Sequence, residues 1–382
     1  MARKPAKRTP RVPPKASSAD GEAAPRSGPS PVLIAAFLLF AVLGGVIGWL
    51  AMSEGEAVLP RVSLSLDQAG GGGKVEELMA SSTSAPPISP PVLQAPPSPQ
   101  NRRTLPVTIG PDGKPSLAPV PDLALVEQTV AGPLPRIAED GAQAWHVYAH
   151  PAADTGGRPR IAVVISGMGL REAPTRMAVQ RLPPPVTLAF APYGEGLQEW
   201  VAQARAAGHE VLLELPMEPY DYPENDPGPH ALLTSLSAEE NTSRLEWLLS
   251  RFAGYAGVIN FFGGKFTTSE TALGPVMAEL KGRGLMIVDN QSASRSKISD
   301  IAGRIDMPFV SATAQLDVDL TAAGIDAALA GLERKAAAEG FAAGVGSPLP
   351  LTIERISLWA EQLNARGIIL VPVTALISGS GK

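Results

Sequence analysis

The chain has 382 residues and a formal net charge of -5, and its 39 Pro and 38 Gly are too many for the whole length to be packed. It contains no Cys, which excludes a disulfide framework, a thiolate nucleophile and a Cys-ligated zinc site. The first 30 residues are basic and the remainder is acidic, so we expect no nucleic-acid surface on the folded part.

The N-terminal region predicts a membrane anchor. Residues 1–30 carry seven Lys and Arg against Asp20 and Glu22, which favours a disordered, cytoplasmic tail. Residues 31–52 then follow without a charged side chain. A helix of this length rises by about 1.5 Å per residue and spans a hydrocarbon core of about 30 Å, so we predict a transmembrane helix.

The charges on either side of this segment predict its orientation. Basic residues precede it, whereas Glu54 and Glu56 follow it. The positive-inside rule therefore predicts a single-pass protein of the bacterial inner membrane, with the C-terminal part in the periplasm. The alternatives are a cleaved signal peptide, whose apolar region would be shorter, and a buried core helix.

Residues 53–157 predict a disordered linker. Pro-rich, Ser-rich and Gly-rich tracts fill much of it and favour an extended, solvated spacer. Near its end, Trp145, His146, Tyr148 and His150 form a small cluster. We expect the cluster to pack against the following domain, and a metal site is the alternative.

Residues 158–377 predict a folded domain in which strands and helices alternate. The expected strands begin near residues 161, 186, 210, 257, 285, 309, 341 and 368. The expected helices cover residues 171–181, 195–207, 237–251, 269–283, 294–304, 322–339 and 352–366. Strict alternation predicts a parallel sheet with right-handed crossovers. About eight such units favour a closed or nearly closed β/α barrel over a doubly wound sheet.

In such a barrel the functional face is formed by residues at the carboxyl ends of the strands. The sequence places the following residues there: Ser166, Gly167, Pro192, Tyr193, Glu214, Glu218, Asn260, Lys265, Asp289, Asn290, Thr313, Asp317, Ser347 and Thr374. None of them is His, which excludes a His-based metal site on this rim. His209 precedes its strand and is expected at the opposite rim, in a packing role.

The carboxylates are the candidates for chemistry. Glu214, Glu218 and Asp289 are able to gather a cation that prefers oxygen ligands, or to act as acid and base, and the alternative is that they bond to nearby backbone groups. Ser166 and Ser347 lack the nearby His that a catalytic triad needs. Gly167 and Gly169 lack the third Gly of a nucleotide-binding loop, so no nucleotide is expected.

Together these motifs resemble the divergent polysaccharide deacetylase family of bacterial envelope proteins. The resemblance covers residues 158–377 and rests on segments 161–170, 182–193, 208–219, 227–233, 257–267, 284–290, 345–350 and 367–376. It implies a distorted β/α barrel of about seven to eight parallel strands. It also implies that the protein is related to metal-dependent enzymes that remove acetyl groups from N-acetylated sugars.

The chain departs from the family pattern at three places. An Asp-Asp pair is replaced by Ser166-Gly167, a His by Phe261, and the His of a Gly-His-Pro motif by Ser347. The resemblance therefore predicts a protein without the metal cofactor of the family, because none of these side chains replaces the lost ligands.

Two functions follow as alternatives. The first is binding of an envelope glycan or a periplasmic protein in a cleft with Tyr193, Tyr220 and Phe262. Its candidate ligand-binding residues are Ser166, Asn260, Phe261, Lys265, Asn290 and Ser347. The second is an active deacetylase that holds a divalent metal such as Zn and uses Glu214, Glu218 and Asp289 as catalytic residues. A third possibility is a scaffold for an envelope complex, in which the domain is incidental.

Overall fold

The computed structural model describes residues 105–109, 113, 115–152 and 155–377. The predicted basic tail, the predicted transmembrane helix and the first half of the predicted linker lie outside these residues. Among the described residues, no helix combines the length and the apolar character needed to cross a bilayer.

The core of the molecule is a nine-stranded sheet in which every strand pairs in parallel. Its order is β10-β9-β8-β7-β6-β5-β12-β11, with β13 paired to β5. The strands are β5 (Arg160–Met168), β6 (Thr187–Phe190), β7 (Val211–Met217), β8 (Gly257–Phe262), β9 (Met286–Asp289), β10 (Phe309–Ser311), β11 (Ala314–Gln315), β12 (Phe341–Gly346) and β13 (Ile369–Leu370).

The sheet closes on itself through residues 309–315. β10 pairs with β9, and β11, two residues later, pairs with β12. Between them the Ala312 amide donates to the Asp289 carbonyl (2.8 Å), and the Thr313 amide donates to the Ala343 carbonyl (2.7 Å). One segment thus crosses from one end of the sheet to the other, which gives a distorted β/α barrel, as predicted.

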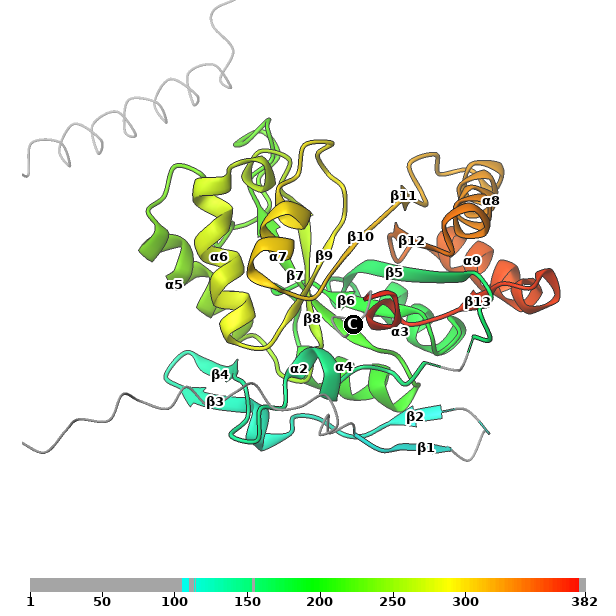
Figure 1. Cartoon of the computed structure of the whole chain (residues 1–382), viewed down its shortest axis with the longest axis horizontal. Helices are drawn as coiled ribbons and strands as arrows, with labels where there is room; N and C mark the ends of the chain where they lie inside the picture. Colours follow the sequence, from blue (N-terminus) through cyan, green and yellow to red (C-terminus); the bar gives the residue numbers. More distant parts are fainter. Residues whose placement is uncertain (1–104, 110–112, 114, 153–154, 378–382) are drawn as a thin grey trace, which may run out of the picture. The chain divides into compact units, whose positions relative to one another are not determined.

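Helices cover the outside of the barrel (Figure 1). They are α3 (Glu172–Arg181), α4 (Leu197–Ala206), α5 (Ala238–Leu249), α6 (Glu270–Gly282), α7 (Ile298–Ile305), α8 (Ala322–Glu339) and α9 (Pro350–Leu363). Local signals mark two of their starts. Ser237 and Glu240 form a capping box at the start of α5, and Pro174 lies in the first turn of α3.

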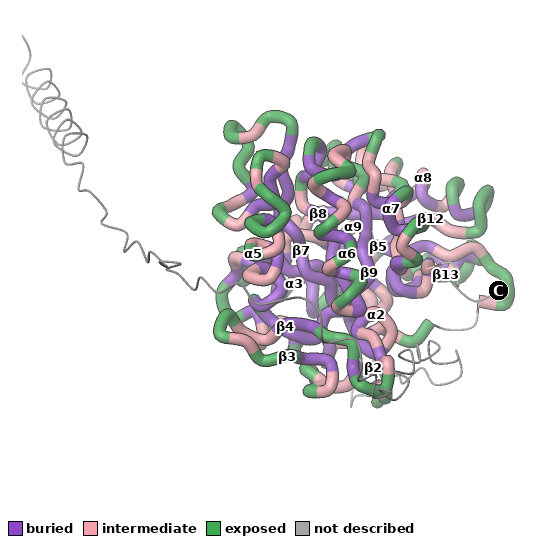
Figure 2. Tube along the Cα trace, turned by 60° about the vertical axis from the view of Figure 1, so that its left-hand side comes forward, coloured by how far each residue is buried: buried purple, intermediate pink, exposed green. Residues whose placement is uncertain are grey.

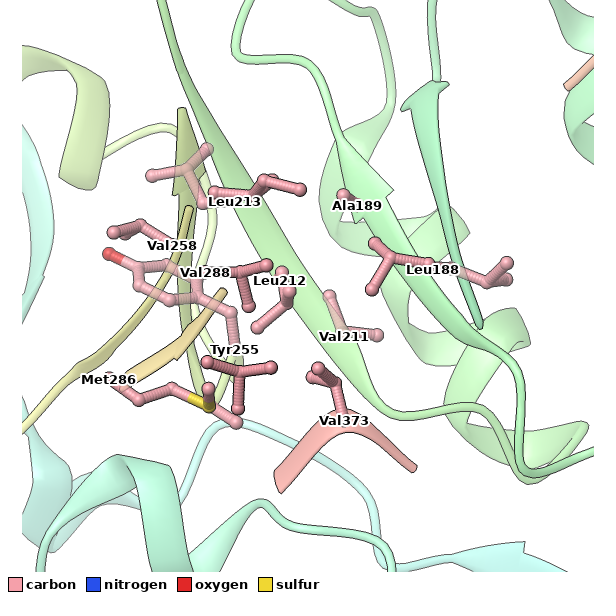
Figure 3. Close-up of a cluster of buried hydrophobic side chains, with 14 of the residues drawn as sticks. Leu188, Ala189, Val211, Leu212, Leu213, Tyr255, Val258, Met286, Val288 and Val373 are labelled. Carbon is pink, nitrogen blue, oxygen red and sulfur yellow. The ribbon is translucent and has the colours of Figure 1, made fainter. Parts of the chain in front are cut away.

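The strands form the buried centre of the molecule (Figure 2). All seven residues of β7 are buried, as expected for a strand covered on both faces. Figure 3 shows Val211, Leu212 and Leu213 of β7 among side chains from β6, β8 and β9. Val373, from the short helix η5 (Val373–Leu376), contributes to the same cluster.

The structure differs from the expected spacer in residues 105–152, which we call the N-terminal arm. The arm contains two antiparallel hairpins, β1–β2 (Val107–Ile109 and Pro115–Leu117) and β3–β4 (Val126–Thr129 and Gly132–Pro135). It ends with α2 (Ala144–Val147), and in Figure 1 it runs along the lower side of the barrel. Because the hairpins are short and rich in Pro and Gly, their composition alone resembles that of a linker.

The arm packs closely against the loops that connect the barrel helices to the following strands. A Cβ on Gly208 would lie 2.5 Å from the Pro115 carbonyl oxygen, and one on Gly254 would lie 2.3 Å from the Val120 side chain. Both glycines also have positive φ. They therefore end their segments and leave room for the arm.

A buried carboxylate joins the arm to the base of the barrel. The Glu210 side chain, which is fully buried, accepts hydrogen bonds from the His150 amide (3.0 Å), from Thr187 Oγ1 (3.2 Å) and from the amide (3.3 Å) and hydroxyl of Thr374. Arg205, from α4, donates to the carbonyls of Ala118 and Tyr148 in the arm. The cluster around Trp145 and His150 therefore packs against the barrel, as expected.

Two other residues, His209 and Thr374, test where the sequence analysis placed side chains along the barrel. His209 is fully buried, with its ring nitrogens 2.9 Å and 3.2 Å from the carbonyl oxygens of Val186 and Val179, in agreement with a packing role at this rim. The expectation that Thr374 lies at the functional face is wrong. The two residues of β13 pair with the start of β5, so the chain continues beneath the barrel to Glu210.

Candidate functional site

A cavity of about 180 Å³ opens at the carboxyl ends of β5, β8 and β12, which we call the mouth cavity. Its walls come from the β5–α3 connection, from β8 and from the β12–α9 connection. The lining residues are Ser166, Gly167, Leu170, Arg171, Pro174, Phe261, Ser347, Pro348 and Leu349. The cavity therefore brings together three of the predicted ligand-binding residues: Ser166, Phe261 and Ser347.

Glu214 lies behind this cavity and is bonded to its wall. The Ser166 hydroxyl and the Gly167 amide both donate to Glu214 Oε1. The side chain is 2% exposed, and burial raises its pKa to about 7, although the two hydrogen bonds favour the charged form. Glu214 is thus a carboxyl that exchanges its proton near neutral pH.

Glu218 is held in a different environment. Its Oε2 accepts hydrogen bonds from the Thr234 amide (2.6 Å) and hydroxyl (2.7 Å), and its Oε1 pairs with Lys265 Nζ (2.8 Å). Burial alone would raise the pKa of Glu218, but these donors and the Lys265 charge together lower it. Glu218 therefore stays ionised and fixes the loop after β7 to the loop after β8.

Asp289 bonds within its own loop. Its two oxygens accept from the Gln291 amide (2.9 Å) and side-chain amide (3.0 Å), and Ser296 adds a further hydrogen bond. The carboxyl is 1% exposed, and burial raises its pKa. These contacts match the alternative that the sequence left open, in which the carboxylates bond to neighbouring groups.

Asn260 and Asn290 bind each other. The Asn260 side chain donates to Asn290 Oδ1 (2.8 Å) and accepts from the Asn290 amide (2.8 Å), while Asn290 Nδ2 donates to the Asn260 carbonyl (2.7 Å). Asn260 is fully buried. The pair joins the ends of β8 and β9, and neither residue lines the mouth cavity.

Two phenylalanines end β8 at the mouth. Phe261 lines the cavity, and its ring centroid lies 4.5 Å from that of Phe262. Phe262 has a φ of 53°, a left-handed conformation that is unusual for a bulky side chain, and it is exposed. The predicted cleft residue Tyr193 lies elsewhere, against Trp247 of α5, with a centroid distance of 6.0 Å.

Residues that the sequence analysis did not select complete the cavity. Arg171, Leu170 and Pro174 follow β5, whereas Pro348 and Leu349 follow β12. Asp317 supports them from the adjacent loop, because its Oδ2 accepts from the Ser347 amide (2.7 Å) and from Thr352 Oγ1 (3.1 Å). Their positions just after strand ends are the signal that would have identified them.

The residues at the mouth do not fit a catalytic metal ion. Within the described part of the chain, no group of three or more His, Asp or Glu side chains is placed to hold one. Glu214, Glu218 and Asp289 each bind their own local donors, and the cavity wall itself offers hydroxyls, a guanidinium and apolar groups. Zinc and related ions require imidazole, thiolate or carboxylate ligands, which this wall lacks.

The fold and this mouth define a class of protein: a β/α barrel with a ligand-sized cavity at the carboxyl ends of its strands. The chain belongs to the divergent polysaccharide deacetylase family, whose model matches residues 163–377. The three positions at which it departs from the family pattern all line the mouth cavity.

Several known proteins are similar to this chain. An uncharacterised protein from Agrobacterium tumefaciens C58, with a crystal structure, is 39% identical, with a TM-score of 0.63 over 64% of this chain and all of that one. The uncharacterised protein YibQ of Escherichia coli K12 is 22% identical over 57% of this chain and 67% of its own length. A CE4 family pseudoenzyme from Bacillus anthracis is 14% identical over 58% of this chain and 66% of its own, with a TM-score of 0.32, too low to support an inference.

Proposed function

We propose that this chain is a binding protein built on a deacetylase scaffold, and that it acts without the metal centre of carbohydrate deacetylases. A single observation carries the proposal. The positions where the family pattern has acidic and imidazole side chains converge on one cavity, and here they are Ser166-Gly167, Phe261 and Ser347. What remains there is suited to hydrogen bonding and apolar contact rather than to activating water.

The cellular setting is part of the proposal. Residues 31–52 anchor the protein in the bacterial inner membrane, residues 53–104 act as a spacer, and the barrel faces the periplasm, where it binds an envelope glycan or protein. The charge asymmetry around residues 31–52 supports this orientation. Cell fractionation tests it: the full chain should sediment with membranes, and deletion of residues 31–52 should release it into the soluble fraction.

The alternative is an active deacetylase that uses Glu214, Glu218 and Asp289. Such an enzyme would need these carboxylates to be free for a metal or a substrate. Instead Glu218 is paired with Lys265, and Asp289 is bonded to Gln291. The contacts therefore favour binding over catalysis.

Acetate release separates the two functions. The purified full-length protein is incubated with N-acetylated chitooligosaccharides and added Zn, Mn or Co. We expect no acetate above the level of a protein-free control. Release of acetate that Asp289→Ala abolishes would overturn the proposal.

A further inference from the structure

Several exposed apolar side chains follow strand ends on the mouth side of the barrel. Within residues 155–377, six large apolar side chains are exposed, and five of them lie at the end of β8 or on the loops that follow β5, β7 and β11. These five, which we call the apolar rim, are Leu170, Tyr220, Phe262, Val318 and Leu320. Apolar side chains exposed beside a cavity are typical of an interaction surface.

Contacts link the rim to the cavity. Leu170 lines the cavity itself, and the ring of Phe262 packs against Phe261 in its wall. Tyr220 lies over Gly264, where a Cβ would be 3.1 Å from its ring. Val318 follows Asp317, whose carboxylate binds the Ser347 amide in the wall. Leu170 and Phe262 therefore adjoin the cavity directly, and Val318 follows a residue that supports its wall.

The backbone at Phe262 indicates that this surface has a role beyond folding. A bulky side chain at a φ of 53° costs free energy, and such conformations persist mostly where function requires them. Here the strained backbone presents an aromatic ring at the mouth instead of burying it.

The cavity combines apolar walls with one exposed cation, Arg171. Leu170, Pro174, Phe261, Pro348 and Leu349 supply the walls. The Arg171 side chain makes no ion pair or hydrogen bond with any other described residue, and the Ser347 hydroxyl likewise has no protein partner among them. Arg171 is exposed at the edge of the cavity, so an anionic group of a bound ligand has access to its guanidinium.

The size of the cavity limits what enters it. A dry protein cavity of about 150 Å³ holds one benzene molecule. The mouth cavity, at about 180 Å³, therefore has room for one side chain of the size of Leu or Phe.

We propose that the mouth captures the C-terminal end of a partner polypeptide, with the terminal apolar side chain in the cavity and the terminal carboxylate on Arg171 and Ser347. The residues just before the terminus then lie along the apolar rim. This inference rests on the proposed binding function and names its partner. Charge complementarity at Arg171 selects a free carboxylate. The three aliphatic members of the apolar rim, Leu170, Val318 and Leu320, favour a peptide over a glycan because they offer no partners for sugar hydroxyls.

The test compares two pools of fluorescent pentapeptides that end in Leu or Phe, with the other four positions randomised. One pool has a free C-terminal carboxylate and the other a carboxamide. Fluorescence polarisation with the full-length protein in detergent measures binding. We expect the free acids to bind about tenfold more tightly or better, as for loss of one charge-assisted hydrogen bond.

Matched variants locate the site. Arg171→Ala should remove the preference for the free acid, because Arg171 caps α3 without a side-chain hydrogen bond and its loss should leave the fold intact. Arg176→Ala is the control, since Arg176 lies on the same helix but pairs with Glu172 outside the cavity. It should bind both pools as the wild type does.

Other outcomes overturn specific parts of the account. Equal binding of acids and amides, or no binding of either, would overturn the carboxylate pocket. Binding of chitooligosaccharides that Phe261→Ala abolishes, without peptide binding, would overturn the peptide partner but leave the binding function standing. One bound zinc per chain at the mouth would overturn the proposed function itself, whatever the peptides do.

Discussion

Two buried glutamates, Glu210 just before β7 and Glu214 in the middle of it, have different surroundings. At the base, Glu210 accepts four hydrogen bonds from three separate segments of the chain. At the mouth, Glu214 accepts two, both from the end of β5 and both on one oxygen. Burial raises the pKa of both carboxyls. The comparison indicates that the polar groups at the base stabilise the fold, whereas the mouth keeps hydrogen-bonding capacity that the fold does not use.

The largest expected effect comes from the base. Glu210→Ala leaves buried donors of His150, Thr187 and Thr374 without their acceptor, so the free energy of unfolding should fall by about 3–5 kcal/mol. Urea denaturation measures it. Glu361→Ala, on the exposed side of α9, is the control and should change stability by less than about 0.5 kcal/mol. Equal effects of the two substitutions would contradict the structural role of the base.

The next largest effect is a pH dependence of stability that arises from Glu214 at the mouth. The pKa of Glu214 in the folded protein, about 7, lies above its ordinary value of 4.5, so the folded state binds this proton more tightly than the unfolded state does. The stabilisation is therefore complete at low pH and is lost as pH rises from about 4.5 to about 7.

Glu214→Gln removes this dependence. Relative to the variant, the wild type should lose up to about 3 kcal/mol of stability across that pH interval and then level off. Unfolding curves at intervals of pH measure the difference, which cancels contributions from Glu210 and Asp289. A difference that does not change between pH 4.5 and pH 7 would contradict the buried setting of Glu214.

A smaller effect tests whether the N-terminal arm belongs to the fold. Arg205 is 1% exposed and holds the arm through the carbonyls of Ala118 and Tyr148. Burial lowers its pKa to about 10, so it remains charged at neutral pH. Arg205→Ala should cost about 2–3 kcal/mol and expose residues 115–150 to protease. Resistance of the arm to cleavage in this variant would show that other contacts suffice.

The smallest effect separates stability from function at the mouth. Asn tolerates positive φ better than Phe does, so Phe262→Asn should stabilise the protein by about 0.5–1 kcal/mol. The same change should weaken peptide binding, because it removes an aromatic ring from the apolar rim. Thermal unfolding and fluorescence polarisation measure the two effects. A variant that is less stable but binds normally would contradict a functional role for the strain.

The sequence predicted the repeating part of the fold well because local patterns determine it. The bounds of α8 and the start of β12 agree with the prediction, as does the parallel pairing of the strands. These features depend on periodicity and on residues a few positions apart. The prediction for residues 105–152 was wrong because contacts with distant residues, such as Arg205 and Glu210, stabilise this region. Local sequence patterns do not reveal such contacts.

The candidate site was predicted in part for the same reason. Strand ends located Ser166, Phe261 and Ser347, which share the mouth cavity. The pattern did not reveal that Asn260 and Asn290 bind each other, or that Lys265 neutralises Glu218, because these pairings join different strands. Arg171 was missed because only the residues nearest each strand end were selected, and Arg171 lies three residues after the end of β5.

Zinc titration of the metal-stripped, full-length protein by calorimetry tests the central claim most directly. Because the mouth offers Ser166, Phe261 and Ser347 where a metal would need ligands, we predict no stoichiometric binding, and no change when Phe261 is replaced by Ala. Tight binding of one zinc per chain, lost in Glu214→Gln or Asp289→Ala, would contradict the claim.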